Sequence, residues 1–185
     1  MSFLLRLKPW LLFTITFGLP MLVALAGNVG LLLKPVSLPF FLGCFIVSTG
    51  MFALGIFSWL WALGTKLPSL LPSHVSVSSK LLKVSLLAPA LYIAAILAVL
   101  AWVSNQGSMN PAFAFVLLPL HLLSMAGIFY GLYFVAKTLK SVELQRPASF
   151  SEFVGEFFLL WFFPVGIWVI QPRINRLFAQ PSWDA

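Results

Sequence analysis

Four long stretches of the chain contain only apolar and weakly polar residues, with no Lys, Arg, Asp or Glu. An α-helix rises about 1.5 Å per residue, so about 20 apolar residues are needed to cross a hydrocarbon layer about 30 Å thick. A helix satisfies its backbone hydrogen bonds internally, whereas barrel strands would alternate polar and apolar residues. The pattern therefore predicts four transmembrane helices, at residues 10–33, 39–63, 84–103 and 112–136.

The first stretch also has two features of a secretory signal peptide. Basic residues precede it, and residues 24–26 have the small-x-small form of a cleavage site. The apolar run nevertheless continues to Leu33, which makes it long enough to span a bilayer. We therefore expect a retained first helix.

A fifth apolar segment, residues 153–176, allows two interpretations. Its charge-free part covers residues 157–172, which is just short of the usual spanning length. Crossing would also separate Arg173 and Arg176 from most other cations of the chain. We expect a broken pair of short helices, re-entrant or in the membrane plane, with residues 164–166 at its tip. The alternative is a fifth transmembrane helix that is kinked at Pro164.

Folding the segment about Pro164 makes a specific prediction about charged pairs. It brings Glu156 near Arg173 and Glu152 near Arg176. Carboxylate–guanidinium pairs at the membrane edge would hold the two arms together. A proton or cation site is the alternative interpretation of Glu156.

Composition and charge support a membrane setting. The chain is 61% hydrophobic and 8% charged, against about 25% charged residues in soluble domains, so a soluble or disordered protein is excluded. The net charge of +7 would fit nucleic acid in a soluble protein, but here it indicates topology. With the N-terminus inside, only Lys34 among the cations up to Arg146 lies outside. We therefore expect a lipid bilayer as partner, no nucleic acid, and both termini in the cytoplasm.

The C-terminal fifty residues or so carry a resemblance. Residues 140–143, 155–158, 161–168 and 171–175 resemble the C-terminal signature of small bacterial multi-pass membrane proteins of unknown function. The resemblance implies a bacterial inner-membrane protein. It implies no activity and assigns no role to any residue.

Candidate chemistry within the membrane is sparse. Ionisable residues at membrane depth are functional candidates, and His121 and Glu156 meet this condition; Asn28 adds a polar group in the first span. His121 either bonds a neighbouring helix or serves a cofactor or proton relay. Paired intramembrane Asp residues, a Gly-x-Ser-x-Gly elbow and an HExxH motif are all missing from the sequence. We therefore expect no catalytic residues, no cofactor and no metal.

Small residues at helical spacing predict close helix packing. Gly127 and Gly131 lie four residues apart in the fourth span, and Ala90, Ala94 and Ala98 form a stripe in the third. Such spacing lets helix backbones approach closely. Packing within this bundle is the simpler interpretation, and a membrane-protein partner is the alternative.

Two functions remain open on the sequence. The first is a non-enzymatic accessory, scaffold or interaction protein in the membrane. The second is a carrier or binding protein for a lipophilic small molecule, with a cavity between the bundle and the broken segment near His121 and Glu156.

Overall fold

The computed structural model describes residues 2–33, 38–75, 77–106 and 113–179, and their regular structure is helical. Four helical stretches are long and apolar enough to cross a membrane: Pro9–Leu32, Pro39–Leu70, Lys80–Val103 and Phe115–Leu144. They correspond to the first span, α4 (Leu38–Lys66), α5 (Lys80–Gln106) and α6 (Phe113–Leu144). The prediction of an all-α protein with four membrane-length helices is confirmed.

The first span is a helix interrupted by a wider turn. After the short helix α1 (Ser2–Arg6), the span begins as α2 (Pro9–Phe13), passes through the π-helical turn η1 (Thr14–Gly18) and continues as α3 (Leu19–Leu33). Pro20 has no N–H to donate, so the ordinary hydrogen-bond ladder fails in this turn. The Leu19 N–H instead reaches back five residues to the Thr14 carbonyl. The proline therefore widens one turn without ending the helix.

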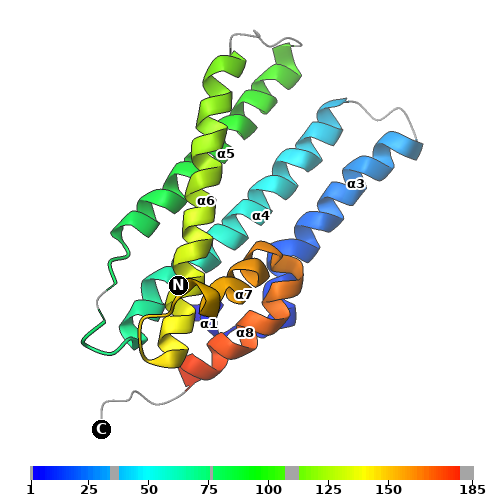
Figure 1. Ribbon diagram of the computed structural model, residues 1–185. Coiled ribbons are helices and arrows are strands. Elements are labelled where there is room, and N and C mark those ends of the chain that lie inside the picture. The colour runs from blue at the N-terminus through cyan, green and yellow to red at the C-terminus, as the bar shows by residue number, and fades with distance from the viewer. Residues whose placement is uncertain (1, 34–37, 76, 107–112, 180–185) are drawn as a thin grey trace.

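The long helices form two antiparallel pairs, α3 with α4 and α5 with α6, and α4 and α5 also contact each other (Figure 1). In Figure 1 the two pairs lean apart away from the end where α6 finishes. Of the eleven Lys and Arg residues, Lys34 lies outside the described residues, and the others lie at that same end. We call it the charged end.

The connection after α6 turns the chain back along the bundle. Gln145 has a left-handed backbone with φ of 53°, and the Arg146 N–H returns to the Ser141 carbonyl at 3.3 Å, so the last turn of α6 closes as a helix C-cap. Ser149 then starts the next helix with a capping box, in which its N–H donates to Glu152 Oε2 at 2.7 Å.

The fifth apolar segment is a helical hairpin of α7 (Phe150–Trp161) and α8 (Phe163–Ala179), which we call the hairpin. The chain breaks at Phe162, whose φ and ψ are −84° and 56°. The prediction of a broken pair is confirmed, but the predicted tip at residues 164–166 is wrong. Pro164 lies in the first turn of α8, where a missing N–H costs no hydrogen bond.

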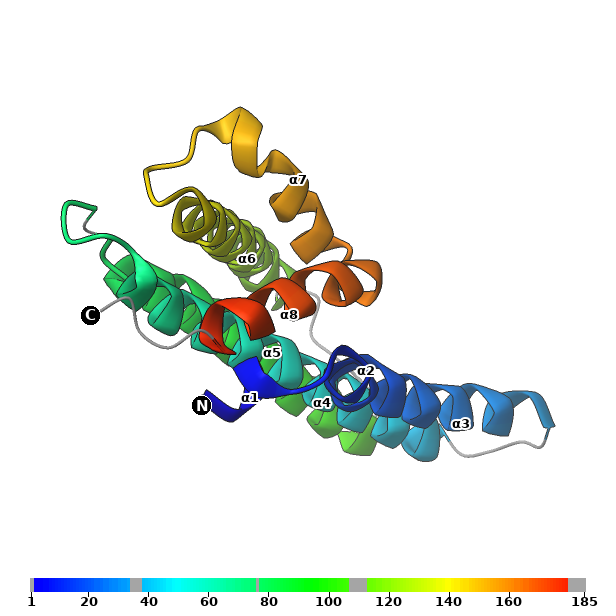
Figure 2. The same cartoon turned by 90° about the horizontal axis from the view of Figure 1, so that it is seen from below.

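The hairpin packs alongside the bundle and its tip points away from the charged end. The ring centroid of Phe153 lies 5.3 Å from that of Tyr133, while the ring of Trp161 near the tip lies 4.7 Å from that of Phe129, which precedes Tyr133 by one turn of α6 and so lies further from the charged end. On the α4 side, the Phe163 ring lies 5.5 Å from the Trp59 ring. Figure 2, viewed from below Figure 1, shows α7 and α8 against α6 and the N-terminal helices.

The hydrophobic core belongs to the charged half of the molecule. Every buried hydrophobic residue that the structure describes falls within residues 5–12, 53–67, 82–86 or 132–174. The segments at 13–52 and 87–131 contribute none of them. The core therefore forms where the hairpin and the N-terminal residues join the four long helices.

Candidate functional site

A cluster of four charged side chains holds the base of the hairpin. Arg173 on α8 donates to both oxygens of Glu143 on α6, from Nε at 2.7 Å and from Nη2 at 2.6 Å. The same Nη2 lies 2.6 Å from Oε1 of Glu156 on α7, and Lys140 Nζ lies 3.4 Å from that oxygen. We call these four residues the clasp. The predicted pair of Glu156 with Arg173 is present.

The clasp carries two positive and two negative charges, so it is neutral as a unit. Burial raises the pKa of Glu156, but the hydrogen bond from Arg173 and the nearby cations outweigh burial and leave that pKa below its ordinary value. The hydrogen bonds that Arg173 donates to Glu143 and Glu156 hold the pKa of Arg173 above its ordinary value, against burial. Glu156 and Arg173 are therefore charged at neutral pH, and the arrangement is an ion-pair network joining three helices.

The second predicted pair, Glu152 with Arg176, is wrong. Glu152 accepts instead from Arg146, whose Nη1 lies 3.2 Å from Oε2, and it also caps α7. Arg176 is exposed, and its Nε donates to the Pro172 carbonyl at 3.4 Å. The reason is local. Glu152 is the third residue of α7 and forms the capping box with Ser149, and Arg146 lies only six residues before it, in the connection between α6 and α7.

Gln171 anchors α8 to two distant parts of the chain. Its Oε1 accepts from Nε1 of Trp59 at 2.9 Å, and its Nε2 lies 3.1 Å from the carbonyls of Leu4 and Leu7. Asn175 donates to the same Leu7 carbonyl at 3.1 Å. Gln171 is fully buried, so these bonds replace the water that its amide would otherwise bind.

Sequence reasoning missed Gln171 and two members of the clasp. A signal for Gln171 exists, because this amide lies between Ile167, Ile170 and Ile174 on the apolar face of α8. The partner Trp59 is 112 residues away, so no local pattern identifies it. Glu143 was missed because the predicted fourth span ends before the helix does.

An apolar cleft of about 450 Å³ opens beyond the hairpin tip. Its walls come from α4, one residue of α5, α6, and the last two residues of α7, Leu160 and Trp161. Among the described wall residues, the Thr49 hydroxyl and the indole N–H of Trp161 are the polar side-chain groups. The volume falls in the range of about 300–1,000 Å³ that is typical of small-molecule sites.

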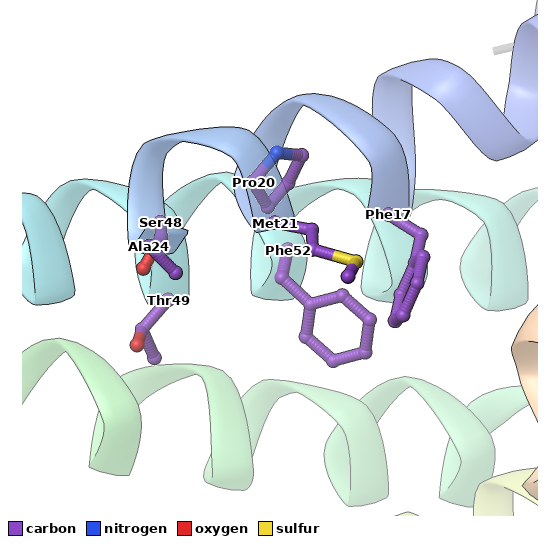
Figure 3. Close-up of a pocket in the computed structure, with 7 residues that line it drawn as sticks. All are labelled: Phe17, Pro20, Met21, Ala24, Ser48, Thr49 and Phe52. Atoms are coloured by element: carbon purple, nitrogen blue, oxygen red, sulfur yellow. The ribbon is translucent and has the colours of Figure 1, made fainter. Parts of the chain in front are cut away.

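A second groove of about 330 Å³ adjoins the cleft on the α3 side of α4. Thr49 and Phe52 contribute to both, and Figure 3 shows the Phe17 and Phe52 rings side by side at one end of the groove. Their ring centroids are 6.5 Å apart, and Phe52 also contacts Phe163 at the hairpin tip, at 6.4 Å. Phe52 therefore separates two apolar hollows directly above the hairpin.

The structure places His121 and Asn28 away from the hairpin. His121 is exposed on α6, and its ring centroid lies 5.7 Å from that of Tyr92 on α5. Asn28 is exposed on α3, and its Nδ2 donates to the Ala24 carbonyl at 2.8 Å. Neither they nor Glu156 line the cleft, so the predicted cavity lies beside the hairpin but does not contain these residues.

The small residues divide into a contacting and an exposed set. A Cβ atom on Gly127 would lie 2.6 Å from the Ser85 carbonyl oxygen, and one on Gly131 would lie 2.8 Å from a methyl of Leu86, so α5 and α6 approach closely there. Ala90 is half-buried, whereas Ala94 and Ala98 are exposed on α5.

Comparisons with protein families, with curated proteins and with solved structures find no match to this chain. Within residues 2–33, 38–75, 77–106 and 113–179, no group of three or more His, Cys, Asp or Glu side chains is placed to hold a metal ion. The candidate site is therefore defined by the geometry of the hairpin, the clasp and the cleft.

Proposed function

We propose that this protein binds a lipophilic molecule, such as a lipid acyl chain, in the cleft above the hairpin. The observation that carries the proposal is the cleft itself, about 450 Å³ and walled almost wholly by apolar side chains at the junction of the two helix pairs. Burial of apolar surface is the interaction that such walls offer, at about 0.8 kcal/mol for each buried methylene group. The bound chemistry is therefore apolar, and the role is non-enzymatic.

The hairpin supports this proposal as one wall of the cleft. Leu160 and Trp161 line it, and the clasp and Gln171 fix the two arms that carry them. A wall held by buried polar contacts keeps its shape, and a preformed cavity avoids the cost of ordering on binding. The network at the base thus serves to position the apolar tip.

A photoactivatable fatty acid tests the proposal on the purified protein. We expect crosslinks on peptides that contain Phe129 or Trp161. In Ile128→Trp the larger ring occupies the cleft and displaces about two methylene groups, so labelling should fall by about tenfold.

The matched control is Leu122→Trp, which adds the same ring to an exposed position of α6 outside the cleft. Its labelling should equal that of the unmodified protein. Equal labelling of Ile128→Trp would show that the probe reacts with the lipid-facing surface in general, and the proposal would fail.

We further propose that the charged end faces the cytoplasm of a bacterial cell and that the long helices cross its inner membrane. The concentration of cations at one end supports this orientation, because cytoplasmic segments are enriched in Lys and Arg. Two reporters fused after Ala179 test this orientation, one that is active in the cytoplasm and one that is active in the periplasm. We expect activity only from the cytoplasmic reporter. Activity of the periplasmic reporter would reverse the orientation.

A role as an accessory or interaction protein is the second proposal, and it rests on His121. This side chain is exposed among apolar neighbours on α6, beside Tyr92. Polar groups at membrane depth favour hydrogen-bonded helix contacts, so this face suits a membrane-protein partner. His121→Leu should then reduce recovery of a co-purifying subunit, whereas Asn28→Leu should not. An unchanged set of co-purifying proteins would remove this proposal.

A further inference from the structure

A pocket of about 380 Å³ lies at the charged end, on the face of α6 opposite to the cleft. It is bounded by the segment before α5, by α6 and by Pro147 in the connection to α7. Unlike the cleft, it contains a cation and several hydroxyl groups: its polar walls include Ser78, Tyr130, Tyr133 and Lys137. The pocket is therefore a separate site with a different chemistry.

Lys137 brings a positive charge to this pocket with no carboxylate to balance it. The three described acids are engaged elsewhere, since Glu143 and Glu156 belong to the clasp and Glu152 binds Arg146. Lys137 Nζ lies instead 5.7 Å from the centre of the Tyr133 ring. An ammonium group beside an aromatic wall, without its own counterion, is suited to receive an anion.

Further donors surround this charge. Within the part of the chain that the structure describes, the hydroxyls of Tyr130 and Tyr133 engage no other group. The Ser78 hydroxyl oxygen accepts from the Lys80 N–H at 3.4 Å, which leaves its own hydrogen free to donate. One ammonium and three hydroxyls match the several oxygens of a phosphate group better than they match a single acceptor.

The depth of the pocket points to the headgroup layer of a membrane. Lys137 lies about 33 Å along α6 from Phe115, where the membrane-length part of that helix starts, and this is close to the thickness of the hydrocarbon layer. Tyr and Lys side chains favour that boundary. A phosphate at Lys137 would thus lie level with the lipid headgroups.

We propose that this pocket binds the phosphate group of an anionic lipid headgroup, with Lys137 as the cation and Tyr130, Tyr133 and Ser78 as hydrogen-bond donors. The remaining cations of the charged end add a general attraction for anionic lipids, and the pocket makes one position specific. A soluble phosphate ester offers the same chemistry, and the experiment separates the two sources.

Native mass spectrometry of the full chain in detergent measures the binding directly. Phosphatidylglycerol is the anionic probe, phosphatidylcholine is the neutral one, and glycerol phosphate is the soluble competitor. We expect phosphatidylglycerol to bind about tenfold more weakly to Lys137→Gln, and a few-fold more weakly to Tyr133→Phe. Phosphatidylcholine should bind weakly to all forms, because its choline already balances the phosphate charge.

The matched control is Lys83→Gln. Lys83 is also a cation of the charged end that lies over an aromatic ring, 5.9 Å from the centre of Trp61, but it does not line the pocket. Its affinity for phosphatidylglycerol should be unchanged. Efficient competition by glycerol phosphate would support the phosphate site and identify its source as soluble. Equal affinities for Lys137→Gln and Lys83→Gln, with no loss in Tyr133→Phe, would overturn the proposal.

Discussion

The two halves of this molecule differ in how many of their apolar side chains are buried. In the half away from the charged end, the long helices are apolar all round and many of their large side chains are exposed, as suits contact with lipid. In the charged half, α7 and α8 are amphipathic, and buried Leu, Ile, Phe and Trp residues form a continuous core. The first half is a pair of helix pairs, and the second resembles the interior of a soluble domain.

The difference lies in what holds each half together. Helices in lipid gain little from apolar contact with each other, so the outer half relies on close approach at small residues such as Gly27, where a Cβ atom would meet Cys44 at 2.7 Å. The charged half adds long-range polar contacts, among them Arg173 with Glu143 and Gln171 with Trp59. Substitutions in the charged half should therefore have much larger effects.

The largest effect is expected for Arg173→Ala. Removing the guanidinium leaves Glu156 buried with only Lys140 nearby, and breaking such a network by loss of one partner costs about 3–5 kcal/mol. Unfolding of the purified protein in micelles measures the loss. Arg176→Ala, at an exposed arginine of the same helix, should change stability by less than about 0.5 kcal/mol. Similar values for the two variants would contradict a structural role for the clasp.

The next effect concerns the tight approach of α7 and α8 at the tip. A Cβ atom on Gly166 would lie 1.6 Å from the Leu159 carbonyl oxygen, so Gly166→Ala forces the arms apart and should cost about 3 kcal/mol. Gly155→Ala is the matched control, because nothing lies within 4 Å of its Cβ position. It should stabilise α7 by about 0.5–1 kcal/mol. Opposite signs for the two glycines are expected in thermal unfolding, and a shared sign would count against the hairpin.

A smaller effect is expected for Gln171→Leu. The change removes the partner of the Trp59 N–H and of the Leu4 carbonyl and leaves the Leu7 carbonyl with Asn175 alone, at about 1–3 kcal/mol. Hydrogen exchange of residues 3–7 should also rise, because Gln171 ties them to α8. Asn28→Leu removes only a bond within α3 and should alter neither measurement. Unchanged exchange in Gln171→Leu would mean that the N-terminal residues are held by apolar contacts alone.

The smallest effect is a dependence of stability on pH. Hydrogen bonds from Arg146 and from Ser149 lower the pKa of Glu152 to about 2 from an ordinary value of 4.5. A depressed folded-state pKa stabilises the protein above pH about 4.5, and this contribution is lost as pH falls towards about 2. Glu152→Gln should therefore show a shallower loss of stability over this interval. Identical acid titrations of the two proteins would refute this assignment.

Local sequence patterns predicted the parts of the fold that depend on local physics. Apolar length identified the four long helices, and the unusual position of Arg173 after a short apolar run indicated a hairpin that pairs it with Glu156. The sequence predicts the break at Pro164, two residues after its actual position at Phe162. A proline can end the helix that precedes it, but it also fits the first turn of a new helix, and Pro164 lies in the first turn of α8.

The contacts that define the site were less accessible to sequence reasoning. Glu143 became a partner of Arg173 only because α6 continues as far as Leu144, beyond the charge-free run that ends at Ala136. The bond between Trp59 and Gln171 depends on how α4 and α8 meet in three dimensions. The cleft depends on the angle between two helix pairs, which their nearly uniform apolar surfaces do not encode locally.

The helices α7 and α8 turn back on the bundle, and we propose that both ends of the hairpin therefore lie on one side of the membrane. Single cysteines at the exposed positions Ser151 and Arg176, in a Cys44→Ser background, test it with a membrane-impermeant maleimide on sealed, oriented vesicles. We predict that Ser151→Cys and Arg176→Cys react from the same side, together with Lys66→Cys at the charged end. Reaction of positions 151 and 176 from opposite sides would mean that the segment crosses the membrane, and would contradict the account.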